Sequence, residues 1–393
     1  MTGDSHTLPP GGTGTTTGLG TGSRPPFAIR RESFAPGELA MALSHYETGV
    51  IESVFELPRG SADKPKVVLK TERGPLLLKR RGVSRDEKRH SFVHGVQAHL
   101  AARGFPLPRL VGTQRERAAS VRIGERVYEL YEFVRGGAYD GTAVAARAAG
   151  QALAELHVCV ASHRARWAPS GGGYHGLSQL GAQIERLPER RQTLEPAQHA
   201  LLSLREAYED ASHKAAEKGL GAWPRQVIHG DWHPGNLLFA SGEVTAVVDF
   251  DSARMDVRVM DLASGALQFS LLRGGPDPSA WPAELDVERF ASFCAGYDGV
   301  VGCRISVGEI EALPWLMIES LIVEAVAPVA ATGSFARIEG GAFLRMIDRK
   351  VAWIREHGGD LASLVHSGAP TGLGRRTESG GAEASHGTND KGR

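Results

Sequence analysis

The hydrophobic pattern of the chain changes once, and this change limits the folds that the chain can adopt. From about Glu47 to Val134 the chain is strand-rich, and apolar and polar residues alternate from Val50 to Leu57 at the period of a β-strand. After Gly136-Gly137 the pattern is mostly helical, except for a β-rich stretch from Gln226 to Asp251. The sequence therefore predicts an α+β fold with two lobes, a small antiparallel β lobe carrying one helix and a larger, mainly helical lobe.

The lobe boundaries follow from this pattern. Residues 27–134 are predicted to form the small, nucleotide-binding lobe and residues 135–367 the large catalytic and substrate lobe. Residues 1–26 and 368–393 are rich in Gly and polar residues and have too little to bury to offset the entropy of ordering, so both are predicted to be disordered. Strands are expected at 50–57, 67–71, 76–80, 121–123 and 126–134, and helices at 142–160, around 178–218, and at 262–272, 287–297 and 307–331.

Charge and cysteine content narrow the range of partners. Lys plus Arg and Asp plus Glu number 45 each in 393 residues, so no net charge attracts nucleic acid or an anionic membrane, and a small ligand is expected. Three scattered cysteines are predicted to be free thiols, which together with the absence of a signal-like N-terminus predicts a cytoplasmic protein. The most apolar stretch, Leu313 to Ala331, contains Glu319, Glu324 and Pro328 and is not predicted to span a membrane. The sequence does not indicate an oligomeric state.

Three oxygen-bearing side chains in the β-rich stretch point to phosphoryl transfer. Asp231 is followed five positions later by Asn236, and a further apolar run leads into Asp249. Transfer of a phosphoryl group requires a carboxylate that accepts the proton of the attacking hydroxyl, together with oxygen ligands for Mg²⁺. We therefore predict Asp231 as the catalytic base and Asn236 and Asp249 as metal ligands, with ATP and Mg²⁺ as cofactors.

The same stretch resembles the aminoglycoside phosphotransferase and choline kinase-like superfamily. That superfamily has the signature His-Gly-Asp-x-His-x-x-Asn, followed by an aspartate-containing strand end, and His229 to Asn236 and Asp249 to Asp251 match it. The small lobe is most similar to the spore-coat and type II homoserine kinase branch, through Tyr46 to Arg81 and His99 to Pro108. The resemblance extends from about residue 40 to residue 365.

The resemblance implies roles for residues outside the three-residue set. Lys79 would contact the nucleotide phosphates, backbone groups at Glu132, Phe133 and Val134 would bind adenine, and the turn at 59–61 would cover the phosphates. Asp261 would brace the catalytic loop. The acceptors of the superfamily include aminoglycosides, choline, homoserine and sugars, so the substrate class is a small-molecule hydroxyl whose identity the sequence leaves open.

One feature departs from the kinase pattern. Kinases pair the phosphate-binding lysine with a glutamate on the following helix, but the middle of this helix, from His90 to Gln97, has no carboxylate. Glu87 is the candidate partner of Lys79, although it also completes a predicted capping box with Ser84. The missing glutamate leaves a second hypothesis open, a non-catalytic ATP-binding scaffold of the same fold.

Several polar residues near the motif have competing interpretations. His229 and His233 could belong to a zinc hydrolase site, but the Pro-Gly-Asn continuation favours a hydrogen-bonded role that braces the loop. Asp251 is expected either to assist a second metal ion or to pair locally. Glu319 and Glu324 are expected to form an exposed stripe on their helix, with a cation-binding pocket wall as the alternative.

Overall fold

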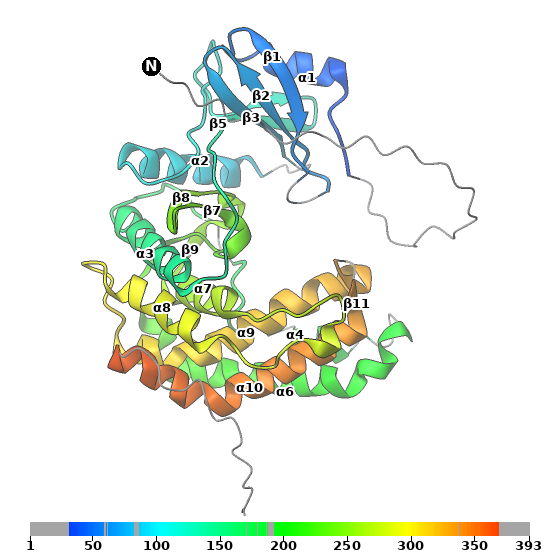
Figure 1. The fold of residues 1–393 in the computed structure, drawn as a ribbon, viewed down its shortest axis with the longest axis vertical. Coiled ribbons are helices and arrows are strands. Elements are labelled where there is room, and N and C mark those ends of the chain that lie inside the picture. Colours follow the sequence, from blue (N-terminus) through cyan, green and yellow to red (C-terminus); the bar gives the residue numbers. More distant parts are fainter. Residues whose placement is uncertain are drawn as a thin grey trace, which may run out of the picture.

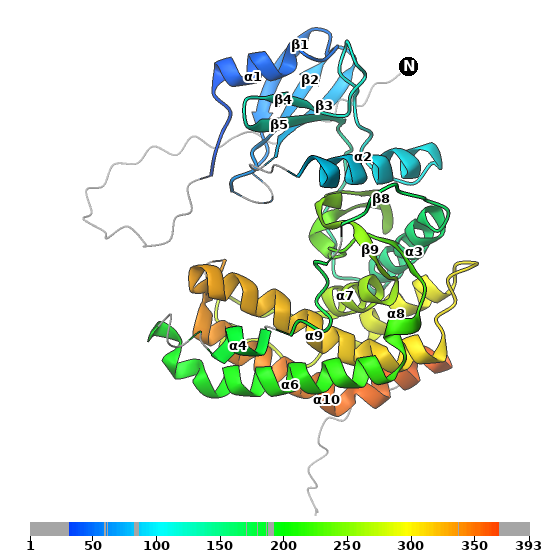
Figure 2. The same cartoon turned by 180° about the vertical axis from the view of Figure 1, so that it is seen from behind.

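The computed structural model describes residues 31–368 except 59, 61, 82–85, 170, 179, 186, 188–191 and 337. Both terminal segments that we expect to be disordered fall almost wholly outside the described residues, as does Ser84. The described residues form two lobes, with the small β lobe above the helical lobe in Figures 1 and 2. This arrangement confirms the predicted α+β fold.

The small lobe is built on one antiparallel sheet with the strand order β1-β2-β3-β5-β4. The helix α1 (Pro36–Leu43), which the sequence pattern did not predict, packs on one face with Ala42 and Leu43 against Leu69, Leu78 and Leu130. β1 is an edge strand, so its alternation does not produce burial and Phe55 is 56% exposed. The strands are β1 (Ile51–Glu56), β2 (Lys66–Thr71), β3 (Gly74–Arg80), β4 (Val121–Ile123) and β5 (Arg126–Glu132).

The helix α2 (Glu87–Ala102) lies between the sheet and the large lobe (Figure 2). Its N-cap is Asp86, whose side chain accepts a hydrogen bond from the backbone N–H of Arg89 at 2.9 Å. The observed N-cap is therefore Asp86 and not the predicted Ser84, which lies outside the described residues.

The large lobe is a helical bundle in which two glycines permit close packing. A Cβ at Gly150 of α3 would lie 2.0 Å from the carbonyl oxygen of Phe293, and a Cβ at Gly296 of α8 would lie 2.0 Å from that of Arg147. The α3 and α8 backbones can therefore approach closely only because both residues are glycines. The helices are α3 (Ala143–Val160), α4 (Leu180–Glu185), α6 (Gln198–Glu217), α7 (Val259–Ser270), α8 (Val287–Asp298), α9 (Val307–Thr332) and α10 (Gly340–Ser367).

Two of these helices differ from the sequence-based expectations. The 28-residue α10 was not predicted, although its apolar residues from Phe343 to Leu361 recur at helical spacing and Glu339 caps its N-terminus. α9 is long and apolar enough to cross a membrane by length and composition alone, but 72% of its apolar window is buried inside the protein. α9 therefore serves as a core helix of the large lobe.

Two antiparallel strand pairs position the predicted site at the top of the large lobe. β6 (Arg225–Ile228) pairs with β9 (Arg254–Val257), and β7 (Leu237–Ala240) pairs with β8 (Glu243–Val247). A two-stranded sheet β10 (Ser334–Phe335) and β11 (Ile338–Glu339) joins α9 to α10. The first two pairs face α2 and the small lobe (Figure 1), so the loops between them lie at the junction of the lobes.

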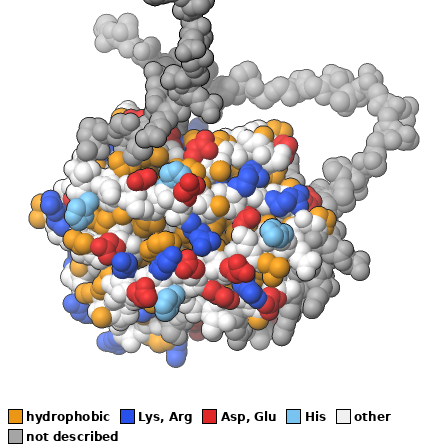
Figure 3. Space-filling model, turned by 90° about the horizontal axis from the view of Figure 1, so that it is seen from below, with side chains coloured by type: hydrophobic (Ala, Val, Ile, Leu, Met, Phe, Trp, Pro, Cys, Tyr) orange, Lys and Arg blue, Asp and Glu red, His pale blue; other side chains and the backbone are white. Residues whose placement is uncertain are grey.

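On the face of the large lobe seen in Figure 3, acidic and basic side chains are interspersed with apolar and uncharged ones. Neither sign of charge forms a continuous field there, and the equal numbers of acidic and basic residues agree with this distribution.

Candidate active site

The loop after β6 holds Asp231 and Asn236 against each other. Gly230 adopts φ 78°, and a Cβ at this position would lie 2.4 Å from the carbonyl oxygen of Ser252, so the loop requires glycine before Asp231. The Asn236 side-chain Nδ2 donates to both the backbone oxygen and Oδ2 of Asp231, at 2.9 Å each. The Asp231 carboxylate is thereby fixed in orientation while 47% of its side chain remains exposed.

His233 sets the charge state of Asp231. Its Nε2 lies 3.6 Å from Oδ2 of Asp231, while its Nδ1 accepts a hydrogen bond from the backbone N–H of Gly235. Burial raises the pKa of Asp231, but the bonds and charges of His233 and Asn236 more than offset this, so the pKa lies below its ordinary value. The same contact raises the pKa of His233 despite its burial. Asp231 is therefore an ionised carboxylate at neutral pH.

The segment after β8 brings Asp249 and Asp251 to the small lobe. Asp249 has φ 63°, a left-handed conformation that turns the chain sharply at the end of the strand. Lys79 of β3 reaches both residues, with Nζ 3.2 Å from Oδ1 of Asp249 and 3.2 Å from Oδ2 of Asp251. This lysine therefore bridges the two lobes.

Asp251 is held by basic residues of the small lobe. Lys64 Nζ lies 3.3 Å from its Oδ2, Arg81 contacts its Oδ1, and Arg89 of α2 donates to its backbone oxygen. Burial opposes ionisation, but Lys79, Arg81 and Lys64 together hold the pKa of Asp251 far below its ordinary value. The structure thus favours local pairing over a second metal site.

Asp261 and His229 support the loop from beneath. The buried Asp261 accepts hydrogen bonds from the backbone N–H groups of His229 at 2.6 Å and Gly230 at 2.8 Å. The fully buried His229 ring contacts the backbone oxygen of Val248 through Nε2, at 3.1 Å. The Val248 N–H in turn donates to the Asn236 carbonyl at 2.9 Å. The loop bearing Asp231 and the strand end bearing Asp249 are therefore joined through Val248.

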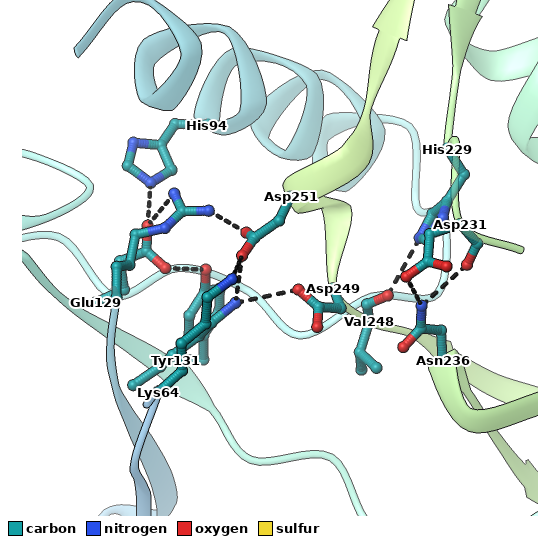
Figure 4. Close-up of polar contacts among 12 residues, drawn as sticks. Lys64, His94, Glu129, Tyr131, His229, Asp231, Asn236, Val248, Asp249 and Asp251 are labelled. Carbon is teal, nitrogen blue, oxygen red and sulfur yellow. Dashed lines mark hydrogen bonds and ion pairs between the residues drawn. The ribbon is translucent and has the colours of Figure 1, made fainter. Parts of the chain in front are cut away.

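The structure places a carboxylate beside Lys79 on the sheet and not on α2. Glu87 is paired with Arg122 at 3.4 Å on the surface, so it is not the partner of Lys79. Glu129 of β5 lies directly opposite Lys79 in the β3–β5 pairing and is fully buried. Arg81 Nη1 at 2.9 Å, His94 Nε2 at 2.6 Å and the Tyr131 hydroxyl at 2.8 Å all contact its carboxylate (Figure 4).

The charges around Glu129 are mutually dependent. Burial raises the pKa of Glu129, but His94, Arg81 and Lys79 more than offset it, so the carboxylate is ionised. Burial likewise lowers the pKa of Lys79, but Asp251, Asp249 and Glu129 outweigh it, so the lysine is charged. The sequence offered no spacing signal for Glu129, because its position opposite Lys79 depends on strand register. His94 occupies the middle of α2, where kinases carry the glutamate.

The hinge offers few free backbone donors. The N–H of Glu132 bonds to the oxygen of Arg109 at 2.9 Å, and the N–H of Phe133 bonds to that of Pro75 at 3.0 Å. Within the described residues, the N–H of Val134 takes part in none of the recorded hydrogen bonds. Of the three predicted hinge donors, Val134 is therefore the one still available to adenine. Residues 59 and 61 of the predicted phosphate-covering turn lie outside the described residues.

The oxygen donors at the site suit Mg²⁺ better than zinc. Asn236 and Asp249 supply amide and carboxylate oxygens, and Mg²⁺ needs only one or two such ligands in addition to phosphates and water. Within the described part of the chain, no group of three or more His, Cys, Asp and Glu could hold a metal ion. The buried His229 is turned toward a backbone carbonyl. These contacts leave no zinc-hydrolase ligand set at the loop.

Glu319 and Glu324 of α9 do not form an exposed stripe. Glu319 is completely buried and contacts His175 Nδ1 at 2.8 Å, so that expectation is wrong for it. Glu324 is open to solvent but faces the catalytic loop, and it accepts a hydrogen bond from Ser320 at 2.9 Å. Burial by surrounding protein, and to a smaller extent the charge of Asp231, raises the pKa of Glu324. Ser264 of α7, one turn after Asp261, donates to Glu324 at 3.5 Å, so Glu324 lies near the loop that bears Asp231.

The chain is similar in sequence to known phosphotransferases. The model of the phosphotransferase enzyme family matches residues 54–302. A homoserine kinase of Beijerinckia indica subsp. indica is 27% identical over 287 residues, which cover 71% of this chain and 80% of that protein.

Two solved structures share the fold. An aminoglycoside phosphotransferase from Alicyclobacillus acidocaldarius superposes with a TM-score of 0.62 at 18% identity, covering 87% of this chain and 98% of that one. A microcompartment-associated aminopropanol kinase has a TM-score of 0.60 at 16% identity, covering 82% and 98% of the two chains. Both alignments include most of the two lobes, so the match is to the whole fold and not to the motif alone.

Proposed function

The chain belongs to the phosphotransferase enzyme family and is an ATP-dependent kinase of small-molecule hydroxyl groups, and we propose that Asp231 is its catalytic base. Asn236 and Asp249 hold Mg²⁺, and Lys79 neutralises the nucleotide phosphates. His229, His233 and Asp261 position the loop. Val134 provides the hinge donor to adenine.

Each residue has a defined task in the transfer. Asp231 accepts the proton of the acceptor hydroxyl as the oxygen attacks the terminal phosphate, and Asn236 keeps its carboxylate in the required orientation. When bound, Mg²⁺ neutralises negative charge on the phosphates. Lys79 supplies a positive charge from the small lobe, and the carboxylates of Glu129, Asp249 and Asp251 keep it protonated. The residues act mainly by positioning and charge.

One observation carries this proposal. Val248 connects the two halves of the site, because its N–H donates to the Asn236 carbonyl and its own carbonyl contacts His229. Asp231, Asn236 and Asp249 are consequently held on adjoining backbone segments at the lobe junction (Figure 4). Such a rigid arrangement is what positional catalysis requires.

The scaffold hypothesis loses the observation that motivated it. It rested on the missing helix glutamate, but Glu129 supplies a buried carboxylate beside Lys79 from β5. A carboxylate that compensates the charge of Lys79 is therefore present, but it comes from β5 and not from α2.

Turnover measurements test the proposal. We expect the wild-type protein to transfer phosphate from ATP to an acceptor in a panel of small alcohols, including homoserine and aminopropanol, on which proteins similar to this chain act by name. Asp231→Asn should lower kcat by about 10²- to 10⁴-fold, the usual contribution of a general base, and leave nucleotide affinity within a few-fold. Equal turnover by Asp231→Asn would show that the base is another residue.

A further inference from the structure

A small cavity beside Glu324 lies where α7, α9 and α10 meet. Its volume is about 100 Å³. Gln268 and Glu324 line its polar side, and Gln268 donates a hydrogen bond to the Glu324 carboxylate. The other walls are mostly apolar, with the basic residues Arg273 and Lys350 at one side, and the apolar residues are Leu271, Leu272, Trp281, Leu321, Ala325, Phe335, Phe343, Met346 and Ile347.

We propose that Glu324 and this cavity form the acceptor subsite, and that the acceptor is a small amino alcohol bearing a branched aliphatic group. The hydroxyl would lie at Asp231, the ammonium group at Glu324 and the aliphatic group in the cavity. The inference rests on the proposed function and specifies its substrate class.

The charge of Glu324 supports binding of an ammonium group. Ser320 and Gln268 donate hydrogen bonds to its carboxylate, but within the described residues no Lys, Arg or His forms an ion pair with it. The two acidic residues that are buried on α9 do have such partners, since Glu319 contacts His175 and Glu309 contacts Arg258 at 2.7 Å. Asp231 raises the pKa of Glu324 and His233 lowers it, so the two carboxylates lie within reach of each other's charge. A cation supplied by the ligand would stabilise both carboxylates.

The volume of the cavity limits the size of the apolar group that it can hold. An apolar cavity of about 150 Å³ accommodates benzene, so one of about 100 Å³ suits a smaller, branched aliphatic group. Lys350 also lines the cavity, but its Nζ already donates to the carbonyls of Leu272 and Pro282, at 3.2 and 2.5 Å. Those two bonds direct the lysine toward the backbone and away from a ligand, whereas Arg273, at the exposed side of the cavity, is the basic residue that a carboxylate-bearing acceptor such as homoserine would have to use.

Calorimetric binding of defined probes tests the inference separately from turnover. The protein would be saturated with Mg²⁺ and a non-hydrolysable ATP analogue and titrated with leucinol, with isohexanol as its deaminated analogue, with aminopropanol, and with homoserine. We expect leucinol to bind at least tenfold more tightly than each of the other three. Tightest binding of homoserine would overturn the aliphatic assignment, and equal binding of leucinol and isohexanol would overturn the role of Glu324.

Two variants localise the recognition. Glu324→Gln should remove the preference for leucinol over isohexanol, whereas the control Glu311→Gln, on the same helix but paired with Lys218 at the surface, should retain it. Ala325→Leu fills the cavity and should reduce leucinol binding to the level of aminopropanol without weakening aminopropanol. If Ala325→Leu leaves leucinol binding unchanged, the aliphatic group lies elsewhere.

Different results would refute the proposed function and the acceptor subsite. Selective leucinol binding with no phosphate transfer to any alcohol would refute the proposed function and leave the subsite intact. Transfer to other alcohols without selective leucinol binding would refute the subsite and leave the kinase assignment intact.

Discussion

Replacing Glu129 by Gln tests whether the sheet supplies the carboxylate that the helix lacks. The change keeps the shape of the side chain but leaves the buried cations Lys79 and Arg81 with less compensating charge. Removing one partner of a buried ion pair costs about 3–5 kcal/mol. Because Lys79 retains Asp249 and Asp251, and Arg81 retains Asp251, we expect a loss near the lower limit, about 3 kcal/mol.

Urea unfolding followed by tryptophan fluorescence measures this loss. With a denaturant slope of about 3 kcal/mol per molar, the unfolding midpoint should fall by about 1 M. The control is Glu52→Gln on β1, which removes the exposed pair with Lys70 and should cost no more than about 1 kcal/mol. If both variants unfold at the wild-type urea concentration, Glu129 does not stabilise the cations and our reasoning about the network is wrong.

A second substitution separates a positioning role from a purely structural one. Adding His94→Glu to Glu129→Gln returns a carboxylate to this cluster from α2, where kinases have it. We expect the single Glu129→Gln variant to raise KM for ATP more than it lowers kcat, because Lys79 contacts the nucleotide, and the double variant to recover part of the nucleotide affinity. Recovery of stability without recovery of KM would assign Glu129 to the fold alone.

Three further predictions address the metal, the loop and a buried lysine. Asp249→Ala should abolish the Mg²⁺ dependence of nucleotide binding in a fluorescence titration, and normal Mg²⁺-dependent binding would exclude Asp249 as a ligand. Asp261→Asn places an amide against the N–H groups of His229 and Gly230, and it should destabilise the protein by about 1–3 kcal/mol in urea unfolding. Burial lowers the pKa of Lys350 to about 8. A lysine in the unfolded chain has a pKa of ~10.4, so the folded protein releases this proton at a lower pH than the unfolded chain does. The free energy of unfolding should therefore rise with pH between those two values. Lys350→Met should remove that part of the rise, and an identical stability–pH profile would contradict the assignment.

The sequence was informative wherever a pattern is local. The alternation and turn residues of the small lobe predicted β2 to β5 to within a few residues, and the spacing of Asp231 and Asn236 reflects a loop whose geometry is fixed by six consecutive positions. Asp261 could also be anticipated, through the resemblance, as a buried residue beneath the loop. In each case the determining contacts lie within one segment or recur throughout a family.

Features that depend on tertiary register could not be predicted in this way. Glu129 lies opposite Lys79 only because β5 pairs with β3 in one particular register. The number of residues between the two positions does not encode that register. The apolar pattern around Glu319 gave no reason to expect His175 as its partner, since these residues are 144 positions apart. α10 was missed for a different reason: its helical periodicity and the turn signal at Gly333, which ends α9 in a left-handed conformation, are both present in the sequence and were overlooked.

A crystal structure of the complex with Mg²⁺ and a non-hydrolysable ATP analogue tests the central claim most directly. Our account predicts one ion bound by the side-chain oxygens of Asn236 and Asp249, the terminal phosphate facing the Asp231 carboxylate, and Lys79 Nζ in contact with the phosphates. An ion bound elsewhere, or a terminal phosphate outside the reach of a hydroxyl held at Asp231, would contradict it.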